Sequence, residues 1–234
     1  MVLFLMALAP VVIIASYIYY RDKYEKEPIW LLIKALIAGG LTVIPILFVE
    51  EFLMVFIDLF DGILRPAYNA FVVAAFSEEL FKYLALMLLF WKSKEFNEKF
   101  DGIVYAVFIS LGFAAVENIL YVTDNGYSTG LIRAITAVPA HAIFGVTMGF
   151  YTGLAKFYKK ERTQLLIKSL ALPILLHGIY DFVLMAGNKW LFIVFVAFVA
   201  YLYIIGLKRL KKLSDQSIYR TDYDLLNKKF DPLK

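Results

Sequence analysis

The sequence predicts an all-α, polytopic membrane protein, built as a bundle of seven transmembrane helices. Hydrophobic residues make up 62% of its 234 residues and aromatic residues 17%, and the mean hydropathy is +0.72. A soluble domain of this size would be far less apolar. The apolar residues also fall into runs of about 20, the length that crosses a bilayer as a helix. Cysteine is absent, which excludes disulfides, thiolate metal sites and a cysteine nucleophile.

Seven runs meet the length requirement for a spanning helix. They cover residues 1–20, 29–56, 66–91, 102–122, 131–155, 165–186 and 190–207. The first run has no basic residue ahead of it and no small-residue cleavage site at its end, so we expect a spanning helix and not a signal peptide. We expect one transmembrane domain over residues 1–207 and a polar cytoplasmic tail over residues 208–234.

Basic residues are concentrated in alternate loops. They are frequent in residues 21–28, 92–99, 156–168 and 208–212, whereas the other side has Arg65, Arg133 and Lys189. Lysine and arginine accumulate on the cytoplasmic side of membrane proteins. The pattern therefore predicts an amino terminus outside and a carboxyl terminus inside. No basic patch with interleaved aromatic residues indicates binding to nucleic acid.

Three charged residues interrupt the third run. Each of Glu78, Glu79 and Lys82 would cost roughly 2.5 to 3.5 kcal/mol at the centre of a lipid-facing helix, so they are expected to face protein or water. Glu78 and Lys82 are four residues apart and are predicted to pair. Glu79 lies about 100° further round the helix and is expected to point to a different neighbour.

Three other runs carry polar residues at depths that the membrane disfavours. These residues are Glu117, Asn118, His141, His177 and Asp181. Counted at about 1.5 Å per residue from the outer ends of their helices, Glu117 lies about 8 Å deep, and Glu78 about 18 Å, with both histidines between. The acid and imidazole groups of four helices are thus expected to share one layer, nearer the outside than the cytoplasm.

Carboxylates and imidazoles buried together suit hydrolysis by an activated water. A glutamate can take a proton from water while a histidine orients that water or stabilises the oxyanion. Alternatively, His141, His177 and Glu117 could ligate zinc as two histidines and a carboxylate, with another glutamate as the base. The local HExxH spacing is absent, so such a metal site would have to assemble from separate helices. The sequence leaves the zinc and the metal-free arrangements equally open.

Other functions fit the same residues. The cluster could be purely structural, locking the helix packing. Buried carboxylates and histidines also build proton-coupled transporters, although the chain shows no inverted repeat. A third alternative is a non-catalytic protein that binds a membrane partner without cutting it.

The order and spacing of six motifs resemble the PrsW family of intramembrane proteases. They are Tyr-x-x-Glu-Pro28, Glu78-Glu79-x-x-Lys82, Asp101-Gly-Ile-Val-Tyr105, Phe113-x-x-x-Glu117-Asn118, His141-x-x-x-Gly145 and His177-Gly-x-Tyr-Asp181. The resemblance extends through the seventh predicted helix. More distantly, the chain is similar to the CPBP group, which includes the CaaX proteases and has the motifs EExxxR, FxxxH and HxxxN or HxxxD.

The broader resemblance implies roles for individual residues. Glu78 would be the base that activates water, and Glu79 a supporting acid. His177 and Asp181 match the last motif of the group. Two positions depart from it. Glu117 stands where the group has a histidine, which leaves His141 as a candidate for holding the water, and Lys82 comes one position before the group's arginine. Lys82, Asn118 and Asp181 are expected to support the catalytic residues.

The resemblance also implies a biological context. PrsW proteins make the first cut, on the extracytoplasmic side, in a single-pass anti-sigma factor, RsiW, during envelope stress. We therefore expect a multi-pass protein of the bacterial plasma membrane, whose substrate is a single-pass membrane protein of the anti-sigma factor type.

Overall fold

The computed structural model describes residues 2–187 and 189–219, and this part of the chain is helical with no strand. It agrees with the predicted all-α class. The elements are α1 (Val2–Arg21), α2 (Ile29–Met54), the 3-10 helix η1 (Ile57–Leu59), α3 (Leu64–Tyr68), the π-helix η2 (Asn69–Phe76), α4 (Ser77–Leu89), α5 (Lys99–Ile135), α6 (Ala137–Phe157), α7 (Arg162–Met185) and α8 (Lys189–Ser214).

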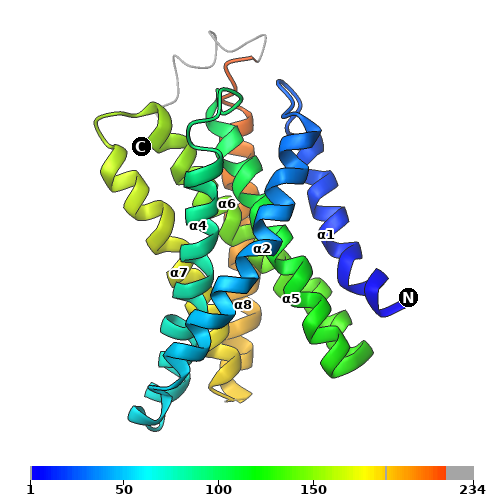
Figure 1. The fold of residues 1–234 in the computed structure, drawn as a ribbon, viewed down its shortest axis with the longest axis vertical. Coiled ribbons are helices and arrows are strands. Elements are labelled where there is room, and N and C mark those ends of the chain that lie inside the picture. Colours follow the sequence, from blue (N-terminus) through cyan, green and yellow to red (C-terminus); the bar gives the residue numbers. More distant parts are fainter. Residues whose placement is uncertain (1, 188, 220–234) are drawn as a thin grey trace.

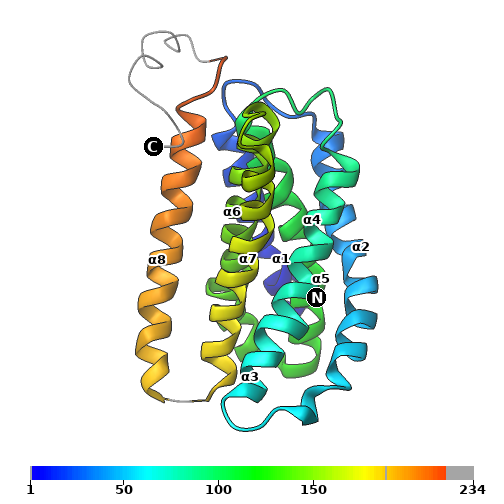
Figure 2. The same ribbon diagram turned by 90° about the vertical axis from the view of Figure 1, so that its left-hand side faces the viewer.

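The long helices run side by side along the longest axis of the molecule (Figure 1). α5 and α6 form the centre, where α5 also packs against α1 and α2, and α6 against α7 and α8. Figure 2 shows α8 on one side of the bundle and α2 on the other. Every residue of α5 from Phe100 to Ala114 is buried, as apolar residues at the centre of a bundle must be.

Glycines allow the central helices to touch through their backbones. A Cβ atom on Gly149 of α6 would lie 2.2 Å from the carbonyl oxygen of Gly102 in α5. A Cβ atom on Gly39 of α2 would lie 1.9 Å from the carbonyl oxygen of Ile109, also in α5. Small residues permit such close approach of helices in membranes, where dispersion contacts drive association. These two contacts fix α5 between its neighbours.

Five stretches of the described residues are long and apolar enough to cross a membrane. They are Phe4–Arg21, Ile29–Leu59, Lys99–Phe157, Arg162–Met185 and Ile193–Ser214, of which the third contains both α5 and α6. The segment α3–η2–α4 is not among them, because it carries Glu78, Glu79 and Lys82 close together. The protein is thus a multi-span membrane protein.

Several helix boundaries differ from those predicted. Residues 102–122 and 131–155 were expected to be separate spans, but α5 continues to Ile135 and α6 begins at Ala137. Within α5, Gly126 has a φ of 78°, a left-handed conformation that glycine adopts readily, and the chain changes direction there. α8 continues past residue 207 to Ser214. Of the predicted tail, residues 220–234 lie outside the described part of the chain.

Candidate active site

A local change of helix type positions the two glutamates of α4. The π-helix η2 ends at Phe76, and Glu78 and Glu79 follow in the first turn of α4. π-helical turns are rare and occur frequently at functional sites. η2 packs on α7 next to His177, because Gly178 has no side chain: a Cβ atom there would lie 2.1 Å from Cδ1 of Phe71. This contact brings the acidic turn of α4 against His177.

Lys82 is fully buried and links both glutamates. Its Nζ atom donates to Glu78 Oε2 at 3.0 Å and to Glu79 Oε1 at 2.9 Å. The pairing of Glu78 with Lys82 was predicted. Glu79 was expected to point to a different neighbour and does contact His177, but it also accepts from Lys82, which was not expected. The reason is that residues three apart on a helix are also neighbours, so one ammonium reaches both carboxylates. Nζ also lies 3.9 Å from the centre of the Phe113 ring.

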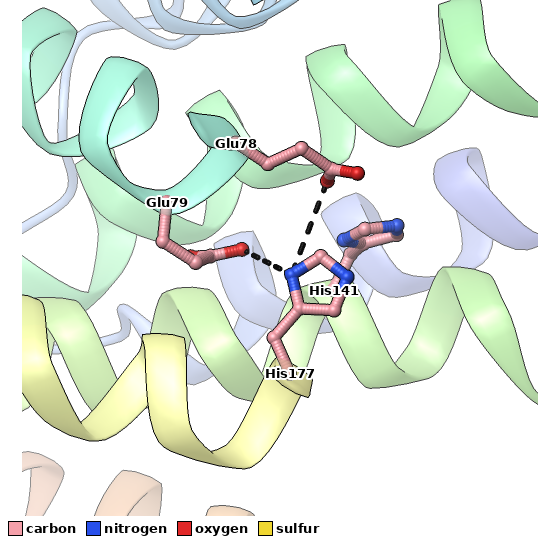
Figure 3. Close-up of side chains that lie close together, drawn as sticks. All are labelled: Glu78, Glu79, His141 and His177. Carbon is pink, nitrogen blue, oxygen red and sulfur yellow. Dashed lines mark hydrogen bonds and ion pairs between the residues drawn. The ribbon is translucent and has the colours of Figure 1, made fainter. Parts of the chain in front are cut away.

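His177 lies between carboxylates from α4 and α7, and Figure 3 shows the two from α4, Glu78 and Glu79. Its Nδ1 atom is 3.0 Å from Glu79 Oε1 and 3.9 Å from Glu78 Oε2. Its Nε2 atom is 3.2 Å from Asp181 Oδ2, one helical turn further along α7. Phe144 stacks on the ring, with 4.8 Å between ring centres. The imidazole is therefore fixed in orientation by contacts at both nitrogens and on one face.

His141 of α6 is held by Lys82 and Glu117. Nζ of Lys82 lies 3.3 Å from Nδ1 of His141. Because an ammonium can only donate, Nδ1 accepts this hydrogen bond and the proton of the ring lies on Nε2. Nε2 then donates to Glu117 Oε2 at 2.8 Å. The rings of His141 and His177 have centres 5.2 Å apart, so all four residues in Figure 3 belong to one cluster.

Arg133 joins this cluster, although the sequence predicted it only as a basic residue on the outer side and not as a site residue. After the turn at Gly126 the chain folds back, and Arg133 Nη2 lies 2.8 Å from Glu117 Oε2. Arg133 Nε donates to Asn118 Oδ1 at 2.9 Å, while Asn118 Nδ2 donates to the carbonyl oxygen of Ala7 in α1. Asn118 therefore supports the arginine. The sequence contained one signal for this role: Arg133 is a basic residue on the side of the membrane where basic residues are rare.

A cavity of about 280 Å³ opens beside the cluster. The polar residues that line it include Glu78, Glu117, Arg133, His141, His177 and Asp181. Glu79 and Lys82 do not line it and lie behind Glu78. The structure thus brings together every predicted site residue, and it separates those that face the cavity from those that hold them in place. Asn118 does not line the cavity, and it contacts the site through Arg133.

The donor atoms also fit a metal ion by type and spacing. One ligand atom each from Glu78, Glu79, His141 and His177 lies within 4.8 Å of the others, and imidazole with carboxylate is a zinc-type donor set. Glu117, the carboxylate expected to complete a zinc site, contacts His141 from outside this group. In the structure the Lys82 ammonium contacts three of the four donors. A metal ion at this position requires that Lys82 move away or lose its proton.

Comparison with known proteins decides the family. A match to the PrsW family of intramembrane metalloproteases covers residues 27–206. The chain belongs to the PrsW family. It is 43% identical over 183 residues to Protease PrsW of Geobacillus kaustophilus, a match that covers 78% of this chain and 79% of that protein. It is 38% identical over 221 residues to Protease PrsW of Clostridioides difficile, covering 92% of each. Protease PrsW of Bacillus subtilis is 37% identical over 206 residues, covering 88% of this chain and 92% of that protein.

Membership of the PrsW family makes this chain an intramembrane protease, as the resemblance of its motifs implied. It also agrees with a multi-pass protein of a bacterial membrane. No solved structure matches the chain. The acid and imidazole cluster beside the cavity is its candidate active site.

Proposed function

We propose that this PrsW protein hydrolyses a peptide bond with a water molecule activated by Glu78. The observation that carries the proposal is the arrangement of Glu78, His141 and His177 around one cavity, inside a membrane protease. Of the two glutamates in the motif, Glu78 lines the cavity and Glu79 lies behind it, which favours Glu78 as the base.

In the proposed reaction, Glu78 takes a proton from water as the oxygen attacks the peptide carbonyl carbon. The tetrahedral intermediate then collapses, the carbon–nitrogen bond breaks, and the leaving nitrogen receives the proton from Glu78. His141 and His177 line the cavity beside Glu78, and an N–H group of one of them would share its proton between its carboxylate partner and the developing charge on the carbonyl oxygen. Glu79 and Asp181 orient His177, and Glu117 orients His141.

Zinc fits the same residues. It would be held by His141, His177 and Glu79, which leaves Glu78 as the base, and it would supply a Lewis acid for the water and the carbonyl. Without zinc, the Lys82 ammonium provides the positive charge at this position. With or without zinc, Glu117 holds His141 and Asp181 holds His177.

The proposal extends to topology and substrate. We propose seven spans, in which α5 and α6 cross separately and α3–η2–α4 crosses with its charged residues turned into the protein. The amino terminus lies outside and the carboxyl terminus in the cytoplasm, as the loop charges favour. The substrate is a single-pass membrane protein of the anti-sigma factor type, RsiW-like, cut near the extracytoplasmic face.

Cleavage of a single-pass reporter in liposomes tests the mechanism. We expect Glu78→Gln and His177→Ala to lower the cleavage rate at least about 100-fold, the usual contribution of a general acid or base. Glu161→Gln is the matched control, because Glu161 lies before α7 and makes no side-chain cap there. Each variant is assayed with and without a strong zinc chelator.

The chelator separates the two arrangements. Activity that survives chelation supports the metal-free reaction, whereas activity that is lost and then restored by zinc makes the histidines ligands. Wild-type cleavage by Glu78→Gln would overturn the assignment of Glu78 as the base.

A further inference from the structure

A second group of acidic residues lies where the α1–α2 connection meets the α4–α5 loop and the start of α5. Figures 1 and 2 show these two connections at the same end of the bundle. The group consists of Asp22, Glu25, Glu27, Glu98 and Asp101. Asp101 is 16 residues before Glu117 on α5, which places the group about 24 Å from the candidate active site along the helix.

Donor oxygens in this group lie at the spacing of a coordination shell. One oxygen each from Asp22, Glu98 and Asp101 lies within 4.8 Å of the others, and the same holds for Glu25, Glu27 and Asp101. Oxygens that bind one calcium ion at 2.3 to 2.6 Å lie within about 5 Å of each other. Asp101 is common to both sets and is fully buried.

Three of these carboxylates use one oxygen to hold the fold and leave the other without a partner. Asp101 Oδ2 accepts from the backbone nitrogens of Asn97 and Glu98, which caps α5. Asp22 Oδ2 accepts from the backbone nitrogen of Glu27 at 2.9 Å. Glu27 Oε2 accepts from the hydroxyl of Tyr105.

The second oxygens are buried and unsatisfied. Asp22 Oδ1, Glu27 Oε1 and Asp101 Oδ1 have no hydrogen-bond partner, although each residue is at most 2% exposed. A buried acceptor without a partner is unfavourable, and a buried carboxylate more so. Each of the three side chains is held in place through one oxygen, so the position of the unpartnered oxygen is also fixed.

We propose that this cluster is a binding site for a hard divalent cation, Ca²⁺ or Mg²⁺. Carboxylate oxygens are the ligands that these ions prefer, and the site contains neither cysteine nor histidine to favour zinc. Ca²⁺ accommodates several carboxylates in irregular geometry, whereas Mg²⁺ keeps most of its waters. Glu98 also accepts from the hydroxyl of Ser217, which follows α8. A cation held by Asp22, Glu98 and Asp101 would join the end of α1 to the start of α5, and Glu98 connects this point to Ser217.

Protons are the competing way to neutralise the cluster. Burial raises the pKa of Asp22 to about 7 and the pKa of Glu27 to about 8. Both carboxyls are thus more readily protonated than in water, so protons compete with a cation for this cluster. Binding is therefore measured at pH 7.0, 8.5 and 9.5, and the affinity for the cation is expected to rise with pH.

Thermal unfolding of the purified protein in detergent tests the site. The protein is stripped with a chelator, and CaCl₂ or MgCl₂ is added at each of these pH values, with calorimetric titration to measure the dissociation constant. At a hundredfold excess over this constant we expect the wild-type unfolding temperature to rise by about 5 to 10 °C. Asp101→Asn and Glu27→Gln keep their structural hydrogen-bond acceptors and remove a charge, so they should fold but lose this rise. Glu161→Gln is the control and should keep it.

Two outcomes would overturn the proposal. One is a wild-type protein whose unfolding temperature does not respond to either cation at any of these pH values. The other is a rise of equal size in Asp101→Asn and Glu27→Gln, which would place the cation on detergent, lipid or another surface. Removal of one charge from the cluster is expected to stabilise the stripped protein. If the variants unfold at or above the wild-type temperature, misfolding does not explain the loss of the response.

Discussion

The ammonium of Lys82 is the positive charge that contacts Glu78, Glu79 and His141. Replacement of Lys82 by methionine keeps the volume of the side chain but leaves the two carboxylates buried without that partner. Removing one partner of a buried ion pair typically costs about 3 to 5 kcal/mol. We expect Lys82→Met to lower the free energy of unfolding by this amount, measured by SDS unfolding in mixed micelles.

A second substitution separates charge from packing. Adding Glu79→Gln to Lys82→Met removes one uncompensated carboxylate, so the double variant should recover part of the lost stability. Lys94→Met, at an exposed loop lysine, is the control and should change little. If the double variant is as unstable as Lys82→Met alone, the loss comes from packing and not from the buried charges.

Residue contacts within one helical turn were predictable, and contacts across the bundle were not. The spacing of Glu78 with Lys82 and of His177 with Asp181 predicts the pairs that the structure contains. The apolar runs 102–122 and 131–155 indicate that the chain reverses between them, but no local pattern indicates that Arg133 then meets Glu117. Such a contact is determined by tertiary structure.

At the scale of elements, the contact between α2 and α5 depends on Gly39. A methyl group on Gly39 would meet the backbone of Ile109, which cannot move without separating the helices. A methyl group on Gly40 would meet Cγ2 of Val116 at 3.2 Å and the carbonyl oxygen of Gly112 at 3.6 Å, which is an ordinary contact. Overpacking costs about 1 to 3 kcal/mol. We expect Gly39→Ala to destabilise the protein by at least this amount and Gly40→Ala to have little effect, as measured by thermal unfolding. Equal effects of the two would mean that α2 does not pack on α5 through Gly39.

Hydropathy predicted where helices exist but not how they are interrupted. The apolar runs correspond to helices across the described chain, because burial in lipid requires each backbone group to bond within its own segment. The π-helix Asn69–Phe76 has no signal in that pattern, since its residues are as apolar as those of an α-helix. Interruptions of this kind are stabilised by contacts with other helices, here between Phe71 and Gly178.

At the scale of the whole molecule, the absence of cysteine makes the topology measurable. Single cysteines can be placed in the natural sequence without removing any other. Asp61 and Lys94 are exposed and flank the segment α3–η2–α4, so they face opposite sides if that segment crosses the membrane. Figure 2 shows these two connections at opposite ends of the bundle. The seven-span topology makes Asp61 external and Lys94 cytoplasmic.

We therefore expect an impermeant maleimide, added to intact cells, to label Asp61→Cys, and to label Lys94→Cys only after the membrane is opened. Lys160→Cys, in the α6–α7 loop, serves as a second cytoplasmic position, and Asp124→Cys, near the turn in α5, as a second external one. Labelling of Asp61→Cys and Lys94→Cys from the same side would mean that α3–η2–α4 does not span. The segment α3–η2–α4 would then enter the membrane and return to the same surface, and the cavity would open to that surface. Reversed labelling of all four positions would keep the seven spans and invert the orientation, which would place the cleavage on the cytoplasmic side.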